Sequence, residues 1–258
     1  MKYFTSFLVV TLFLMNTFDL SAQDSPDQRQ IFPHGISLEY GIGSYAHIDE
    51  YISKEKYSGN LPYFRASFTN YHEKYLYQIG IEFRSASHIK NYNVSAEVYQ
   101  FSLNQGFLYP LPEFHLFSKK AYAYIGPSNE VFIYSNRQNI AVSGFDYAQS
   151  YAGLFSLGLN GVLIYPLSNN LNIETSLNFH ALSLAFRMVD LEETDESPVK
   201  LLTLFSGTNS VYKLGIRYYL SNKLSVKVSY LFAATRISSW EPLYAASDNL
   251  IFTLTYGL

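Results

Sequence analysis

Hydrophobic and polar residues alternate along most of this chain with a period of two. In the final segment, Leu250, Phe252, Leu254 and Tyr256 share one parity, and Ile251 is the only large apolar residue of the other parity. This period is typical of a β-strand whose two faces lie in different surroundings. A free edge strand invites pairing with other chains, so the final strand predicts a partner. We expect that partner to be the first strand, at 34–45, which would close the sheet into a barrel.

The same alternation predicts ten strands joined by short turns and longer polar loops in turn. The strands are expected at about 34–45, 61–70, 75–86, 94–108, 120–135, 149–165, 171–187, 209–220, 224–236 and 247–258. The loops are expected at 46–60, 87–93, 136–147, 188–208 and 236–247. Eight strands is the alternative, because 94–108 changes its apolar parity near Tyr99 and 120–135 contains Gly126-Pro127, so that either segment could hold a bulge or a break. The predicted fold class is all-β, an antiparallel up-and-down transmembrane β-barrel.

Composition indicates which environment surrounds that barrel. Charged residues make up 15% of the chain, against about 25% in ordinary soluble domains, and aromatic residues reach 17% with 24 tyrosines. A surface of this kind suits lipid, with tyrosine at the two interfaces. The charges within the strands are expected on the non-aromatic face, where they would form a polar lumen network: Glu39, Arg65, Glu82, Arg84, Glu174, Lys213, Arg217 and Lys227. A soluble lipocalin-like barrel would reverse this arrangement, with an apolar interior and a charged exterior.

The N-terminus is typical of a secretory signal. Lys2 precedes an apolar run from 3 to 18, and Ser21-Ala22 offers small residues for cleavage. A membrane-spanning helix is the weaker interpretation, because the run is short and a polar segment follows it. We therefore expect a signal peptide at 1–22, a short periplasmic segment at 23–33 and a barrel domain at 34–258.

The cysteine content and the net charge exclude several kinds of cross-link, anchor and binding partner. Cysteine is absent, which excludes a disulfide framework and a lipobox lipid anchor. The formal net charge of −3 argues against a nucleic-acid partner, which would require a basic surface.

A resemblance to a known family rests on three features: the Ser-Ala-Gln end of the signal, the Tyr-Pro-Leu-Ser-Asn-Asn turn at 165–170, and the terminal alternating strand. Together they resemble the small outer-membrane β-barrel (porin-like) proteins of Gram-negative bacteria. The resemblance implies a place in the outer membrane with both termini in the periplasm. It also implies outer-membrane lipids as partners, and barrel assembly machinery that reads the C-terminal strand. Such barrels usually end on an aromatic residue, whereas this chain ends on Leu258.

Two interpretations of the lumen charges stay open. Charged groups inside a narrow barrel have to pair or hold water, so the favoured interpretation is an electrostatic plug that fills and stiffens the lumen. The alternative is a narrow pore with a slight preference for anions, because five of the eight groups are basic.

His180 and Ser183 are the weak catalytic candidates. Outer-membrane lipid A deacylases, which are small barrels, use a His and a Ser that share a face. Here the two residues stand three apart, which places them on opposite faces of a regular strand unless a bulge intervenes. We therefore favour polar residues that line the lumen or its rim, and we assign no catalytic residue.

No metal or cofactor site is indicated. An acidic group in the longest loop lacks the glycine spacing of a calcium loop and is expected to be solvated: Asp190, Glu192, Glu193, Asp195 and Glu196. The remaining histidines are scattered over different turns and loops: His34, His47, His72, His88 and His115.

The expected function is that of a non-enzymatic outer-membrane barrel, acting as a structural or binding barrel or as a narrow pore through its loops and lumen. One alternative is an outer-membrane lipid hydrolase, similar to a lipid A deacylase. The other is an accessory subunit of a secretion or uptake machine. Fold does not choose among them.

Overall fold

The computed structural model describes residues 34–72, 74–91, 94–112, 114–117, 119–139, 148–189 and 199–258. The expected signal peptide, the segment 23–33 and the acidic group of the longest loop lie outside these residues. In this part of the chain the strands are β1 (Gly35–Asp49), β2 (Ser53–Asn60), β3 (Tyr63–His72), β4 (Tyr75–Asn91), β5 (Val94–Pro110), β6 (Phe114–Leu116), β7 (Lys119–Gln138), β8 (Ala148–Ser168), β9 (Leu171–Val189), β10 (Val199–Leu202), β11 (Gly207–Tyr219), β12 (Leu224–Ile237) and β13 (Leu243–Gly257). The described residues contain no helix long and apolar enough to cross a membrane.

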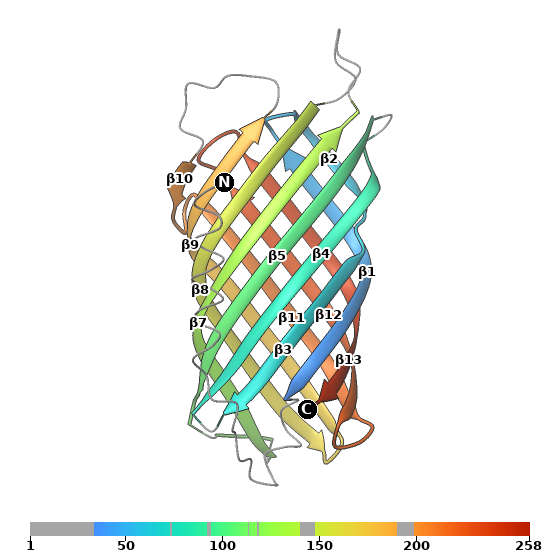
Figure 1. The fold of residues 1–258 in the computed structure, drawn as a ribbon, viewed down its shortest axis with the longest axis vertical. Helices are drawn as coiled ribbons and strands as arrows, with labels where there is room; N and C mark the ends of the chain where they lie inside the picture. Colours follow the sequence, from blue (N-terminus) through green and yellow to red (C-terminus); the bar gives the residue numbers. More distant parts are fainter. Residues whose placement is uncertain are drawn as a thin grey trace.

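The strands form one closed antiparallel sheet, a tall barrel of tilted strands (Figure 1). The barrel closes where β13 pairs with β1, in an unbroken register from Gly35 opposite Gly257 to Asp49 opposite Leu243. The predicted partner of the final strand is therefore confirmed. At the level where β3 lies between β1 and β4, hydrogen bonding around the full circumference leaves no free edge.

Ten strands make the wall, as predicted, and the eight-stranded alternative is wrong. β2 and β3 are the two halves of one wall strand, since both pair with β1 and with β4. β10 continues the line of β11, because both pair with the same edge of β9. β6 pairs only with the start of β7 and lies outside the wall.

The two ends of the barrel differ in their connections. At one end, here called the turn end, lie the short connections at 169–170 and 220–223, the end of β3, the start of β4 and the end of β13. At the other, the loop end, lie residues 50–52 and 238–242, the end of β4 and the start of β5, the end of β7 and the start of β8, and the end of β9 and the start of β10. In Figure 1 the turn end is at the bottom, where the C-terminus is marked.

Irregularities occur in strands other than those expected. Gly126-Pro127 lies within β7 with no shift in its pairing to β8 or β5, so it does not break the strand. Gly126 is required there, because a Cβ would lie 1.8 Å from the Phe107 carbonyl oxygen. The register shifts lie instead in β4, between Ala86 and Ile89, and where β9 passes from His180 to Leu182 opposite β8, with two more at His47/Asp49 in β1 and Pro166/Ser168 in β8.

The outward face carries an apolar band that begins at the turn end. On β1 it comprises Ile36, Leu38, Tyr40 and Ile42, all 45% exposed or more, and on β13 the predicted outward residues Leu250, Phe252, Leu254 and Tyr256. The inward residues between them are small or polar, except Ile251, which packs against Tyr63 and Leu231. The ordinary membrane-barrel pattern, apolar outside and polar inside, therefore holds over this part of the wall.

Toward the loop end the pattern reverses. On β2 the outward residues Lys54, Lys56 and Ser58 are polar and exposed, whereas the inward Tyr57 is 2% exposed. The prediction of a loop at 46–60 is therefore mostly wrong, because most of these residues lie on β1 and β2, which continue past the apolar band. The parity change near Tyr99 has the same cause: β5 carries no bulge, but its inward residues change from Gln100 to Val98 and Ala96.

This reversal also corrects the rule that all strand charges lie on the non-aromatic face. Glu97 and Asp248 lie on the outward face, sharing parity with Tyr99 and Leu250. Both stand beyond the apolar band, where the outer surface is polar.

Candidate functional site

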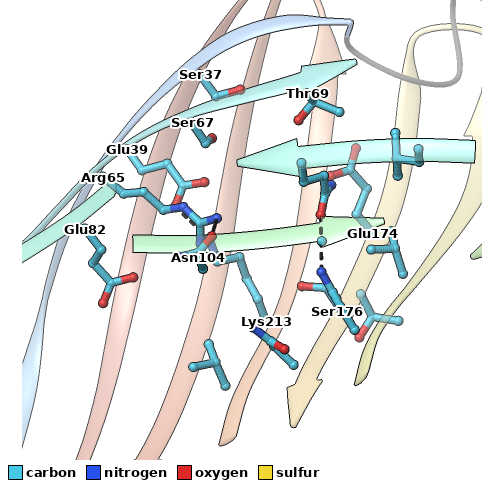
Figure 2. Close-up of a pocket in the computed structure, with 18 of the residues that line it drawn as sticks. Ser37, Glu39, Arg65, Ser67, Thr69, Glu82, Asn104, Glu174, Ser176 and Lys213 are labelled. Carbon is cyan, nitrogen blue, oxygen red and sulfur yellow. Dashed lines mark hydrogen bonds and ion pairs between the residues drawn. The ribbon is translucent and has the colours of Figure 1, made fainter. Parts of the chain in front are cut away.

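The lumen holds a polar cavity of about 140 Å³ that reaches from the middle of the barrel toward the turn end. Seven of the eight predicted lumen charges line it: Glu39, Arg65, Glu82, Glu174, Lys213, Arg217 and Lys227. Arg84, the eighth, is 4% exposed and lies beside Glu82. In Figure 2, Glu39, Arg65 and Glu82 project from β1, β3 and β4, and Glu174 and Lys213 project from β9 and β11.

The charges pair both across the lumen and along a single strand. Lys213 Nζ lies 2.7 Å from Glu39 Oε2, and the Tyr63 hydroxyl donates to the same oxygen at 3.0 Å. Arg84 Nη2 lies 2.6 Å from Glu82 Oε1, and Arg84 Nη1 donates to Ser247. These pairs satisfy carboxylates that would otherwise be very unfavourable away from water.

Glu174 is shared by two cations. Arg217 Nε lies 2.5 Å from one carboxylate oxygen, and Lys227 Nζ lies 3.1 Å from the other. A bidentate guanidinium contact fixes orientation as well as charge, which a lysine alone would not do.

Arg65 is the least paired of these charges. Its Nη2 donates to Asn104 Oδ1 at 2.8 Å, and its buried Nε has no hydrogen-bond partner among the described residues. The guanidinium lies over Gly80, where a Cβ would come within 2.6 Å of Nη2. Gly80 therefore makes room for Arg65 against the wall.

The sequence alone missed Glu130. It is 5% exposed, lines the cavity and accepts a hydrogen bond from Asn209. A bulge or break at Gly126-Pro127 would change which of the following residues face inward, so parity did not assign Glu130 to the lumen. Its shared parity with Ser128 and with the inward Phe132 is the signal that could have identified it. With Glu130 included, the network has four acids and five bases, so the excess of positive charge falls from two to one.

An apolar seal lies above the network at the loop end. It is a cluster of fifteen buried residues: Tyr45, Tyr57, Leu61, Ile89, Ala96, Val98, Phe132, Tyr134, Ala152, Leu154, Ala185, Leu202, Ile237, Trp240 and Leu243. Its members come from β1, β2, β4, β5, β7, β8, β9, β10, β12 and β13 and from the connections next to them, so they surround the full circumference. This arrangement puts a layer of packed apolar side chains between the cavity and the loop end.

A buried ion pair stands within the seal. Arg187 Nη2 contacts Asp49 Oδ1, and both side chains are completely buried. Asp49 also accepts from Ser150 and from Asn136, so it joins β1 to β7, β8 and β9. Neither charge was among the predicted lumen residues, because Asp49 fell in a predicted loop and Arg187 at the last position of a predicted strand.

The bulge in β9 brings His180 and Ser183 to the same face. Both are buried in the lumen wall, 0% and 2% exposed. They do not contact each other as a pair, however, because the Ser183 hydroxyl lies 2.8 Å from that of Ser156. The bulge therefore provides the shared face without the His–Ser contact.

His180 lies instead between a carboxylate and a different serine. Its Nδ1 is 3.2 Å from Glu130 Oε2, and its Nε2 is 3.5 Å from Ser128 Oγ. The order Ser, His, acid is that of a nucleophilic triad. The Ser128 hydroxyl donates to Asn178 Oδ1 at 2.9 Å, so its proton is not directed at the imidazole.

The histidines do not gather into a metal site. His47 lies inside β1 rather than in a loop, stacked on Tyr57 at 5.5 Å between ring centroids. Among the residues that the structure describes, no group of three or more His, Cys, Asp or Glu side chains is placed to hold a metal ion.

Comparisons with known proteins rest on structure. No family model matches the chain, and no curated protein matches its sequence. The outer membrane protease OmpT of Escherichia coli is similar in structure, with a TM-score of 0.51 and 6% identity over 88% of this chain and 97% of that one. The translocator domain of the autotransporter NalP from Neisseria meningitidis has a TM-score of 0.50 and 12% identity over 90% and 91% of the two chains. The fold is that of an outer-membrane β-barrel. The apolar outward band is the surface that such a barrel presents to lipid.

Proposed function

We propose that this protein is a closed, non-conducting and non-enzymatic outer-membrane barrel that acts through its outer surface and loops. In this proposal its turn end and both termini face the periplasm, and its loop end faces outward. The observation that carries the proposal is the apolar seal, whose residues are at most 9% exposed and surround the full lumen. A layer of packed apolar side chains, within which Asp49 and Arg187 neutralise each other as an ion pair, is a strong barrier to ions.

The polar network below the seal supports a structural role for the lumen. Glu39, Glu82 and Glu174 each contact at least one cation at 3.1 Å or less. Paired charges join β1, β9, β11 and β12, and Arg84 of the pair on β4 donates to Ser247 of β13, so the network holds the wall in one geometry. This is the plug interpretation of the lumen charges.

A narrow anion-selective pore has less support. The network has five bases and four acids, so its excess of positive charge is only one. Most of the bases are paired with carboxylates and are not free to attract an anion. Such a pore would also need a continuous path through the seal.

A lipid hydrolase is the second candidate, supported by one specific observation, the contacts of His180 with Glu130 and Ser128. These groups lie within the lumen wall, 5% exposed or less, away from any lipid surface. The likeness to a protease concerns the fold alone at 6% identity. An accessory role in a secretion or uptake machine would be recognised by co-purifying proteins.

A liposome swelling assay tests the closed lumen. Vesicles that contain the refolded protein and a trapped large sugar should keep a constant volume when placed in an iso-osmotic solution of a small sugar, like protein-free vesicles. A triple variant, Tyr45→Ala, Tyr57→Ala and Tyr134→Ala, removes three large rings of the seal and should make the vesicles swell. Swelling of wild-type vesicles would overturn the proposal.

A further inference from the structure

The barrel wall is interrupted on its outer surface between β2 and β4. These strands pair only at Ser58 opposite Lys90, and the ladder resumes at Tyr63 opposite Arg84. Two local features explain the gap. Pro62 has no N–H to donate across it, and the bulge between Ala86 and Ile89 adds a residue to β4.

The interruption forms a recess, here called the wall recess, lined by residues that include Ser58, Asn60, Ser85, His88, Lys90 and Tyr99. Its inner side is closed, because Tyr57, Leu61 and Ile89 behind it are at most 2% exposed. The β2 and β4 backbones also approach closely at Gly59, where a Cβ would lie 3.0 Å from the His88 carbonyl oxygen. The recess is thus a blind site on the outer surface and not a side entrance to the lumen.

The recess stands directly above the apolar band. On the turn side its neighbours are the outward rings of Phe64 and Phe83, 49% and 44% exposed, with Phe101 on the adjoining strand. The next outward residues toward the loop end are Ser85 and Tyr99. The change from phenylalanine to serine and tyrosine marks the level at which acyl chains give way to headgroups.

The chemistry of the recess suits an anion. Lys90 and His88 are both exposed, and Ser58, Asn60 and Ser85 add neutral donors from the facing strands. The nearby acids have other neighbours: Glu55 accepts from Asn91, and Glu97 stands opposite Arg137 on β7. A lysine surrounded by hydroxyl and amide donors is a typical phosphate site.

We propose that the wall recess binds a phosphate on the headgroup of an outer-leaflet glycolipid, with the acyl chains lying on Phe64, Phe83 and Phe101. The juxtaposition of a cationic recess and an aromatic surface one step below it selects a phosphorylated amphiphile over a free anion. This binding does not depend on whether the lumen is closed.

Native mass spectrometry of the detergent-solubilised protein tests the site. The probes are diphosphorylated lipid A, the same lipid A without phosphates, and inorganic phosphate. One lipid A should stay bound, with an affinity roughly tenfold above that of the unphosphorylated form. Inorganic phosphate alone should show no retained adduct and should not displace the lipid.

Two exposed substitutions locate the site. A Lys90→Gln, His88→Gln variant should lose about tenfold in lipid A affinity, as expected for lost charge-assisted contacts. Arg236→Gln is the matched control, because Arg236 is an exposed outward cation near the loop end of β12. Heat-modifiable migration verifies that each variant is folded. Equal losses in the two variants, equal binding of unphosphorylated lipid A, or binding of free phosphate as tight as lipid A would each overturn the proposal.

Discussion

Arg217 holds the Glu174 carboxylate with two guanidinium nitrogens, Nε at 2.5 Å from Oε1 and Nη2 at 3.1 Å from Oε2. Its Nη1 donates to the hydroxyls of Ser225 and Thr255, each at 2.9 Å. One side chain thus joins β11 to β9, β12 and β13, on both sides of its own strand. The contact fixes the lumen near the turn end, as the Asp49–Arg187 pair does within the seal.

The first prediction concerns this contact. Glu174→Gln should lower the free energy of unfolding by about 3–5 kcal/mol, because Arg217 and Lys227 would lose their shared carboxylate inside the barrel. Urea titration in phospholipid vesicles, with folded and unfolded bands separated on unheated gels, measures the change. Glu55→Gln is the control, since Glu55 is exposed and accepts a surface hydrogen bond from Asn91, so that it should shift the midpoint little. Equal stability of Glu174→Gln and wild type would contradict a structural network.

The second prediction compares two outward residues of β1. Leu38→Arg should destabilise the barrel in vesicles by about 2–4 kcal/mol, since it places a charge within the apolar band. Ser44→Arg lies six residues further along the same exposed face, where the band ends, and should change stability by about 1 kcal/mol or less. The same urea titration serves for both. If Ser44→Arg were as destabilising as Leu38→Arg, lipid would reach higher on the wall than the apolar band indicates.

The third prediction concerns the seal. Asp49→Asn should leave Arg187 without its anionic partner and loosen the loop end while the barrel stays folded. Trp240 reports this directly, because it is the only tryptophan of the chain and lies in the seal at 9% exposure. Acrylamide should quench its fluorescence more strongly in Asp49→Asn than in wild type.

Asp248→Asn is the matched control for the seal. Asp248 lies on the outward face near the loop end and accepts a hydrogen bond from Ser44. Its substitution should leave Trp240 quenching unchanged. An equal effect of both variants would show that quenching reports a general loosening and not the loss of the buried pair.

The fourth prediction separates the closed barrel from a hydrolase. A fluorophosphonate probe should not label Ser128, because its hydroxyl donates to Asn178 and is buried in the lumen wall. Mass spectrometry of the probe-treated, refolded protein measures labelling. Modification of Ser128 that disappears in His180→Ala but persists in Ser183→Ala would support the catalytic alternative and contradict the proposal.

The strands of the wall could be predicted from the sequence because the apolar band imposes one physical condition on its outward residues. Each residue facing outward there has to be apolar, so the alternation of Leu250, Phe252 and Leu254 could be interpreted without any tertiary contact. The strand number and the pairing of β13 with β1 followed from it, and both are confirmed.

The loop end could not be predicted in the same way. There the outer face contacts water and the inner face is apolar. The polar Lys56 therefore points outward and the aromatic Tyr57 points inward, the reverse of the pattern in the apolar band. A polar strand of this kind has the same composition as a loop. The seal depends on residues from ten strands, and only the closed sheet brings Tyr45, Val98 and Trp240 together.

The candidate site shows the same limit. The parity of each strand placed Glu39, Glu174 and Lys213 on the inner face, but partner choice depends on the stagger of strands far apart in sequence. Lys213 meets Glu39 across 174 positions. The bulge that turns His180 and Ser183 to one face is a local backbone event that their spacing alone does not reveal.

Single-channel recording on the refolded wild-type protein in a planar lipid bilayer is the most direct test of the closed barrel. Insertion is verified beforehand by heat-modifiable migration of the same preparation. In 1 M KCl a closed barrel should give a baseline without steady open levels, whereas the triple seal variant of Tyr45, Tyr57 and Tyr134 should give discrete openings. A stable open level in the wild-type protein, with a reversal potential that shows anion preference in a salt gradient, would rule out the closed barrel and support the narrow pore.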